Sequence, residues 1–189
     1  MQEVFLRVAH WNSLRYEQVY DKELAIALLR EEYKEWLEAD KPVDKLDALC
    51  DIVYVTLGII WKADLNPLAI GEAGERAAII IETLLDANEM WPAYFIGTYL
   101  DVMQYDKEYS LEMSVSLIMS AAMTEMTGLG LTPDECIEAL LIVCDSNDSK
   151  SIKKTASNVK ANGNDKGEYF VPPESRLTAL LEKANGRLN

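Results

Sequence analysis

The chain has 189 residues, 49% of them hydrophobic, which is enough to bury the core of one domain. Its 18 Lys and Arg residues against 32 Asp and Glu residues give a net charge of −14, which excludes a nucleic-acid polymer as partner because such polymers bind to basic surfaces. No apolar run is long enough to cross a membrane and no secretory signal opens the chain, so we expect a cytoplasmic protein without membrane contact.

Helical periodicity runs through most of the sequence. Apolar residues recur three and four positions apart and alternating β-branched residues are scarce, which predicts an all-α fold. Proline in first turns and glycine after last turns mark several helix ends. We expect helices at residues 2–16, 21–39, 43–63, 67–89, 92–104, 109–127, 132–145 and 174–185.

The stretch 145–173 differs in composition, since it is rich in Ser, Asn, Lys and Gly. A polar loop of this length is uncommon in a compact domain and is usually either functional or disordered. A functional loop is favoured, because the aromatic and proline residues at 169–173 can attach it to the helices. We therefore divide the chain into a helical bundle at 1–145 and, at 146–189, a Lys-bearing loop with a C-terminal helix that packs back on the same domain.

The predicted helix at 21–39 carries a run of three glutamates. Glu31, Glu32 and Glu35 lie one turn apart or adjacent, so they share one side of the helix. We place the core-facing stripe of this helix beside them, at Leu24, Ala27, Leu28 and Leu37. Taken alone, this run is more typical of a solvated face that pairs with Arg30 and Lys34.

The next helix, at 43–63, carries a second acidic run. Asp44, Asp47, Asp51 and Tyr54 follow spacings of three, four and three, and strongly apolar residues come directly after Asp51. A short connection predicts that the two helices pack antiparallel, which brings five carboxylates together. Buried like charges need a counter-charge, and carboxylate oxygens suit Mg²⁺ or Mn²⁺. The two runs together therefore favour a hard-metal site and phosphate chemistry.

The other reactive side chains are few. His10 is the only histidine, which excludes most imidazole-based catalysis and a ferritin-like di-metal site, because that site needs Glu-x-x-His on two helices. The three cysteines, Cys50, Cys136 and Cys144, lack the spacing of a zinc site, and we expect them to be reduced.

The segments LLREEYKEW and DALCDIVYVTLG resemble the all-α nucleoside triphosphate pyrophosphohydrolases, the superfamily of MazG, dimeric dUTPase and phosphoribosyl-ATP pyrophosphohydrolase. The superfamily pattern is EExxE on one helix and ExxD on the next. Glu31, Glu32 and Glu35 match the first, and Asp51 matches the last acid of the second. Ala48 stands where the other acid is expected, and Asp47 is the nearest carboxylate.

The resemblance implies a helical bundle of the MazG-like type that hydrolyses a nucleoside triphosphate between the α and β phosphates. It implies Mg²⁺ or Mn²⁺ as cofactor, with Glu32 as second-metal ligand or general base, a role that Glu31 could exchange with it. It also implies nucleotide-pool housecleaning and a homodimer. The metal ligands implied are Glu31, Glu32, Glu35, Asp47 and Asp51.

Two further regions resemble parts of these enzymes that contact the nucleotide. The SNDSK segment places Asn147 and Lys150 as phosphate or nucleotide contacts, and the KGEYFVPP segment adds Lys166 and Tyr169. Near the N-terminus, the resemblance places base recognition at Trp11, Asn12 and Arg15. A capped and packed helix end explains the N-terminal residues equally well.

A non-catalytic helical binding protein is the main alternative, since the acid missing at position 48 would be the step at which activity was lost. The two hypotheses differ in metal binding and in pyrophosphate release.

Overall fold

The computed structural model describes residues 1–66, 70, 73, 74, 77, 92–105, 110–150 and 166–187. These residues form seven α-helices and no strand, which confirms the all-α prediction. The seven helices agree with predicted ranges to within three residues at each end, and most of the predicted helix at 67–89 lies outside the described residues. The helices are α1 (Gln2–Ser13), α2 (Lys22–Glu38), α3 (Pro42–Lys62), α5 (Pro92–Tyr105), α6 (Leu111–Gly128), α7 (Pro133–Asp148) and α8 (Glu174–Gly186).

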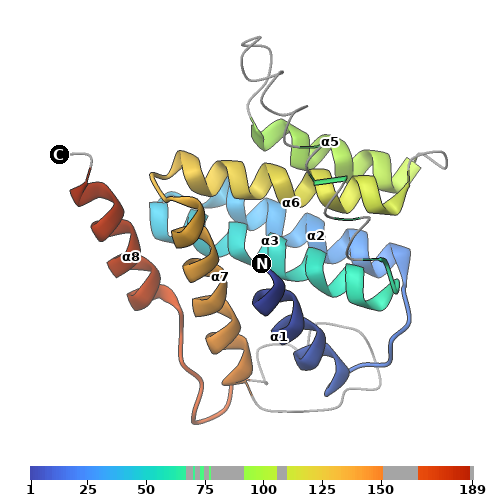
Figure 1. Ribbon diagram of the computed structural model, residues 1–189, viewed down its shortest axis with the longest axis horizontal. Helices are drawn as coiled ribbons and strands as arrows, with labels where there is room; N and C mark the ends of the chain where they lie inside the picture. The colour runs from blue at the N-terminus through green and yellow to red at the C-terminus, as the bar shows by residue number, and fades with distance from the viewer. Residues whose placement is uncertain are drawn as a thin grey trace.

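Four of the helices form a closed bundle (Figure 1). Helix α2 packs on α3, α3 on α6, α6 on α5, and α5 back on α2. The α2–α3 hairpin is antiparallel, as its short connection predicts. Arg30 of α2 forms an ion pair with Asp101 of α5, with 2.6 Å between Nη2 and Oδ1, and so ties one side of the bundle.

Helix α3 lies at the centre of the fold. It begins with Pro42 in its first turn, where the missing N–H costs nothing, and Lys62 in its last turn complements the helix dipole. Leu46, Leu49 and Ile52 are fully buried, and α3 also contacts α1, α7 and α8. An acid on α3 can therefore face neighbours from several parts of the chain.

Helices α1, α7 and α8 cover the side of α3 away from α5, at a steep angle to the four-helix bundle (Figure 1). Helix α7 starts with a capping box, in which Thr132 accepts from the Glu135 backbone and the Glu135 carboxylate accepts from the Thr132 backbone. Glu135 also pairs with Arg187 and Lys183, which attaches the end of α8 to the start of α7.

The predicted core stripe of α2 is wrong at two positions. Ala27 is exposed and Leu37 is 58% exposed, whereas Ala25, Ile26 and Leu29 are buried. The true buried stripe is turned about one residue around the helix, because α2 must face both α3 and α5. This rotation brings Glu32 onto the buried side.

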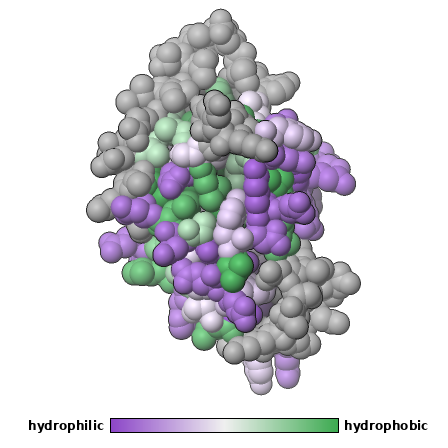
Figure 2. Space-filling view, turned by 90° about the vertical axis from the view of Figure 1, so that its right-hand side faces the viewer, coloured by the Kyte–Doolittle hydropathy of each residue, from purple (hydrophilic) through white to green (hydrophobic). Residues whose placement is uncertain are grey.

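Cys50, Cys136 and Cys144 are free and buried, in agreement with the prediction. Among the described residues, no helix is both long enough and apolar enough to cross a membrane. Figure 2 shows hydrophobic residues at the surface beside hydrophilic ones on the described part of one face. Large apolar side chains that are exposed include Leu6, Val19, Leu37 and Tyr105.

Candidate functional site

The three glutamates of α2 differ in exposure. Glu32 is 4% exposed, while Glu31 and Glu35 are exposed. The helix turns Glu32 toward the interior because it continues the buried stripe of Ile26 and Leu29 at helical spacing. A carboxylate buried to this degree needs hydrogen bonds or a positive charge around it.

The acids of α3 lie on one stripe. Asp47 and Asp51 are half-buried and Tyr54 is 8% exposed, and these three follow spacings of four and three. Asp44, one turn earlier, is exposed. Burial along the stripe therefore increases from Asp44 to Tyr54. The Tyr54 hydroxyl is buried and has no hydrogen-bond partner among the described residues.

Asp47 is the point where charges from four segments meet. The pKa of Asp47 is raised to about 6, first by burial and then by the carboxylates of Glu174, Glu32 and Glu35, in that order. The ammonium group of Lys150 acts in the opposite direction. Residues of α2, α3, the start of α8 and the turn after α7 therefore lie within electrostatic reach of one carboxyl group.

The donors around Asp47 fit a hard divalent cation in their chemistry. They are carboxylate oxygens, the ligands that Mg²⁺ and Mn²⁺ take, and a cation would relieve the repulsion that raises the pKa of Asp47. Within the described ranges, no three His, Cys, Asp or Glu side chains are close enough together to hold a metal as they stand. The ligand assignment therefore rests on donor chemistry and remains a prediction.

The structure brings four of the predicted substrate residues together. The indole Nε1 of Trp11 donates to the carbonyl oxygen of Asn147 at 2.8 Å, and Nη2 of Arg15 donates to the carbonyl oxygen of Lys150 at 3.0 Å. The Arg15 guanidinium lies 4.1 Å from the Trp11 ring centroid. The Trp11 ring also meets the Tyr54 ring edge-on, with 5.8 Å between the ring centroids.

Among the described residues, the side chain of Asn12 does not hydrogen-bond to the turn at 147–150 but lies between α1 and α3. Its side chain is 6% exposed and donates to the carbonyl oxygen of Val8 at 2.9 Å. It also packs against α3 at Gly58, where an added Cβ would lie 3.4 Å from the Asn12 Nδ2.

Lys166 and Tyr169 are exposed, and Tyr169 is 82% exposed. The Lys166 ammonium lies 4.9 Å from the Phe170 ring centroid. The segment is attached to the end of α7 at Val171, whose backbone N–H donates to the Ser149 hydroxyl at 2.9 Å. The predicted attachment of 169–173 thus occurs through Val171 in the described residues, while Tyr169 points into solvent.

A comparison with known families matches part of the chain. Residues 8–77 match the sequence profile of the family described as phosphoribosyl-ATP pyrophosphohydrolase. Residues 8–77 form a phosphoribosyl-ATP pyrophosphohydrolase domain. Neither the search of curated proteins nor the search of solved structures found a match to the chain.

The phosphoribosyl-ATP pyrophosphohydrolase domain belongs to the all-α MazG-like superfamily, as the acidic motifs predict. Members of the family are pyrophosphohydrolases that generally use Mg²⁺. The match includes Trp11, Asn12, Arg15 and both acidic runs. Lys150 and Glu174 lie outside it, so the second half of the chain contributes charges to a site built on the domain.

Ala48 is the position at which this pyrophosphohydrolase domain departs from the superfamily pattern. Ala48 is 5% exposed, whereas its neighbour Asp47 is half-buried and has its pKa raised by burial and by carboxylates that include Glu32 and Glu35 of α2. Positions 47 and 48 lie four and three residues before Asp51, so both adjoin Asp51 on α3. That Asp47 serves in place of the expected acid stays a prediction.

The sequence did not indicate Glu174. Among the neighbouring charged groups, this carboxylate has the largest effect on the pKa of Asp47. Glu174 follows two prolines and opens α8. An acid in a first turn is explained by the helix dipole alone, so its sequence context gave no signal of a functional role.

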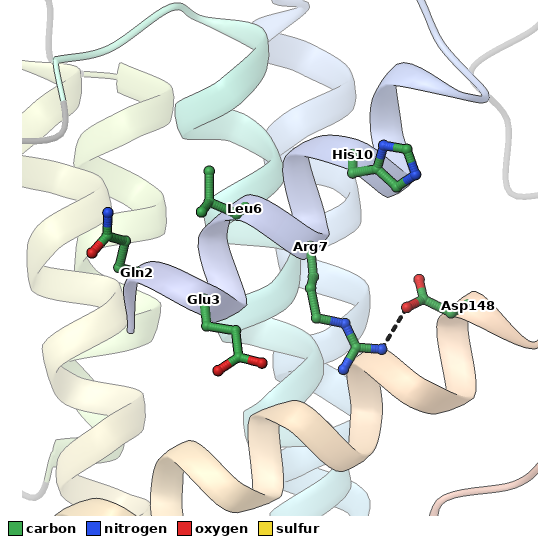
Figure 3. Close-up of a pocket in the computed structure, with 6 residues that line it drawn as sticks. All are labelled: Gln2, Glu3, Leu6, Arg7, His10 and Asp148. Carbon is green, nitrogen blue, oxygen red and sulfur yellow. Dashed lines mark hydrogen bonds and ion pairs between the residues drawn. The ribbon is translucent and has the colours of Figure 1, made fainter.

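A surface cavity lies apart from the acids of the pyrophosphohydrolase domain (Figure 3). Residues of α1 and the end of α7 line it: Gln2, Glu3, Leu6, Arg7, His10 and Asp148. Within it, Arg7 reaches across to Asp148. None of the predicted site residues lines this cavity, so the carboxylates and not the cavity define the candidate site.

Proposed function

We propose that the chain is a Mg²⁺-dependent nucleoside triphosphate pyrophosphohydrolase, with Mn²⁺ as an alternative ion. It cleaves between the α and β phosphates and releases a nucleoside monophosphate and pyrophosphate, and its role is nucleotide-pool housecleaning. The observation that carries the proposal is Asp47 on a phosphoribosyl-ATP pyrophosphohydrolase domain, because carboxylates of α2 and α8 raise the pKa of Asp47 and Lys150 lowers it.

Five carboxylates are proposed to hold the cation: Glu31, Glu32, Glu35, Asp47 and Asp51. When bound, the ion would screen the triphosphate and lower the pKa of a coordinated water. Glu32 is the proposed acceptor of the proton of the attacking water, because its burial keeps this carboxylate away from bulk solvent. Glu31 is the alternative base.

Lys150 is the proposed cationic partner of the leaving pyrophosphate. Its charge already acts on Asp47, so a phosphate group near the carboxylates would lie within its field. Asn147 is the second proposed phosphate contact, and Lys166 and Tyr169 are weaker candidates because they are exposed. Trp11, Asn12 and Arg15 stay predictions for base recognition.

The proposal includes a homodimer in the cytoplasm. Exposed apolar side chains such as Leu37 and Tyr105 support self-association, since a second copy would cover them. Three free thiols suit a reducing compartment. The division into a bundle at 1–145 and a returning tail at 146–189 is part of the same proposal, supported by the contacts of α8 with α3 and α7.

The test is a substrate screen with product identification. Ribo- and deoxyribonucleoside triphosphates, with phosphoribosyl-ATP, are incubated with the protein and Mg²⁺, and pyrophosphate and orthophosphate are quantified separately. We expect pyrophosphate from at least one nucleotide and its loss in Asp51→Asn. Release of orthophosphate would contradict the reaction type, and unchanged turnover in Asp51→Asn would contradict the site.

Ala48 supports one alternative, a MazG-like helical binding protein with impaired catalysis, because the pattern expects an acid there. Calorimetric titration of the protein with Mg²⁺ and with a nucleotide, combined with a pyrophosphate assay, separates the two functions. A catalytically impaired protein would bind a nucleotide and release no pyrophosphate, whereas the enzyme binds Mg²⁺ and turns over.

A further inference from the structure

A row of side chains on α1 faces the last turn of α7. Arg7, Trp11 and Arg15 are spaced by four residues, which places them on one side of a helix, although α1 itself ends at Ser13. Arg7 lies 2.8 Å from Asp145 and 2.5 Å from Asp148 between ion-pair atoms, and Figure 3 shows the contact with Asp148.

The next two members of the row contact main chain and not side chains. Trp11 donates to the carbonyl of Asn147 and Arg15 to the carbonyl of Lys150. The last carbonyls of a helix lack the N–H donor that a further helical turn would supply, so side-chain donors can bind them, and a cation near them is favoured by the helix dipole. These two donors therefore fix the backbone at 147–150.

The side chain of Arg15 is itself held in place by several contacts. It is 8% exposed, its Nη1 donates to the carbonyl of Trp11 at 3.3 Å, and its guanidinium covers the Trp11 ring. Among the described residues it forms no ion pair. A nearly buried guanidinium that donates to two backbone carbonyls has few accessible rotamers, because each contact restricts it, so it holds the two backbone segments together.

The turn at 147–150 makes a second contact, with the segment before α8. The Ser149 hydroxyl accepts from the Val171 N–H, which leads the chain into α8. The carboxylate of Glu174 and the ammonium of Lys150 both act on Asp47. The turn at 147–150 thus carries Lys150 and is also hydrogen-bonded to the segment that leads to Glu174. Trp11 and Arg15 hold this turn from the N-terminal region.

We propose that Trp11 and Arg15 are positioning residues, which hold the turn at 147–150 so that the Lys150 ammonium meets the polyphosphate of the substrate. This rests on the proposed function. For these two residues the positioning role takes the place of the base recognition proposed above, because the indole N–H and the guanidinium donate to the protein and the Trp11 ring has Arg15 on one face. It predicts an effect on every triphosphate and none on the choice of base.

The test uses Trp11→Phe, which keeps the ring and removes the donor, and Arg15→Met, with Arg15→Lys as the conservative variant. Arg7→Gln is the matched control, since it loses contacts with the same turn but none with the main chain at 147–150. We expect Trp11→Phe and Arg15→Met to raise KM by about 3- to 10-fold equally for all triphosphates, with partial recovery in Arg15→Lys. Arg7→Gln leaves KM unchanged.

A double-variant cycle identifies the route of the effect. In a Lys150→Met background, Trp11→Phe has no further effect on KM, because the residue that it positions is gone. Amide hydrogen exchange at 147–150 gives a readout without catalysis, and it is faster in Trp11→Phe and Arg15→Met than in Arg7→Gln. A KM effect that persists with Lys150→Met, a changed order of base preference, or unchanged exchange would overturn the proposal. If the wild-type protein releases no pyrophosphate, the proposed function fails and exchange alone decides whether α1 holds this turn.

Discussion

Asp47 is a residue whose ionisation opposes folding. Its pKa is raised from 3.8 to about 6 by burial and by Glu174, Glu32 and Glu35, so the folded state holds its proton more tightly than the unfolded chain does. From this group, stability falls as the pH rises from about 4 to about 6, and the full cost is present above that range. Above about pH 7 the cost amounts to about 1–3 kcal/mol.

We therefore expect Asp47→Asn to stabilise the metal-free protein by about 1–3 kcal/mol at about pH 8, and to give little gain near pH 4. Urea denaturation at both pH values measures this. Asp44→Asn is the control, because Asp44 lies one turn earlier on the same helix and is exposed. Equal gains in the two variants, or a gain at Asp47 that does not depend on pH, would contradict the electrostatic explanation.

Ala48 gives a second prediction at this scale. Asp47 and position 48 both adjoin Asp51, so an acid at either position can serve the same site. Asp47→Asn should reduce pyrophosphate release, and adding Ala48→Glu to it should restore part of that release. Ala48→Gln in the same background is the control, since glutamine has the same size without the charge. If the glutamate and the glutamine behave alike, position 48 does not take part in metal binding.

The residue scale also shows what a sequence pattern can and cannot supply. The identity of the five acids follows from spacing and motif, but the burial of Glu32 does not, because Leu24, Ala27, Leu28 and Leu37 offer an equally apolar stripe. Which stripe is buried depends on α5, a helix distant in sequence. Glu174 has no pattern of its own and reaches Asp47 only through folding.

At the scale of elements, helix ends were predictable where the local chemistry is explicit. Pro42, Pro92 and the Thr132 capping box open helices within two residues of the predicted starts. The end of α7 was less predictable, since it extends past residue 145 to Asp148. Ser146 and Asn147 have loop-like identities but are buried in the structure, where packing against α1 outweighs their weak helix propensity.

The contact between α2 and α5 gives a prediction for a pair of elements. A Cβ added at Gly97 of α5 would lie 2.9 Å from the hydroxyl of Tyr33, whose ring is stacked on Trp36. Gly97→Ala should therefore destabilise the protein by about 1–2 kcal/mol, because the steric cost exceeds the gain in helix propensity. Thermal denaturation measures the change.

Gly128→Ala is the matched control for Gly97→Ala. Gly128 also lies in a helix, and an added Cβ there meets no atom within 4 Å. Alanine should be neutral or slightly stabilising at this position. A loss of stability in Gly128→Ala as large as that in Gly97→Ala would show that the α2–α5 approach is not the cause.

At the scale of the whole molecule, the candidate site joins segments from both halves of the chain. The α2–α3 hairpin is local in sequence and follows from a short connection, so the pairing of the two helices that carry the acidic runs was predictable. The approach of Lys150 and Glu174 to Asp47 needs α7 and α8 to pack on α3, and those long-range contacts follow from no local pattern. The resemblance supplied Lys150, while Glu174 required the structure.

The proposed metal site predicts that the stability of the whole fold depends on a divalent cation. Carboxylates from α2 and α3 repel one another without a counter-charge, and a cation that binds only the folded state stabilises it through mass action. At a Mg²⁺ concentration about 100 times Kd the gain is about 2.7 kcal/mol, which corresponds to a rise in Tm of about 5–10 °C for a chain of this size.

We expect this rise when MgCl₂ is added to chelator-treated protein, and its reversal by EDTA. NaCl at matched ionic strength is the control, because general screening acts on all exposed acids of a chain with net charge −14. Asp51→Asn should lose the Mg²⁺-specific part of the shift and keep the NaCl part. If NaCl raises Tm as much as MgCl₂ does, the acids form a screened surface and not a metal site, since only a site distinguishes a divalent ion from ionic strength.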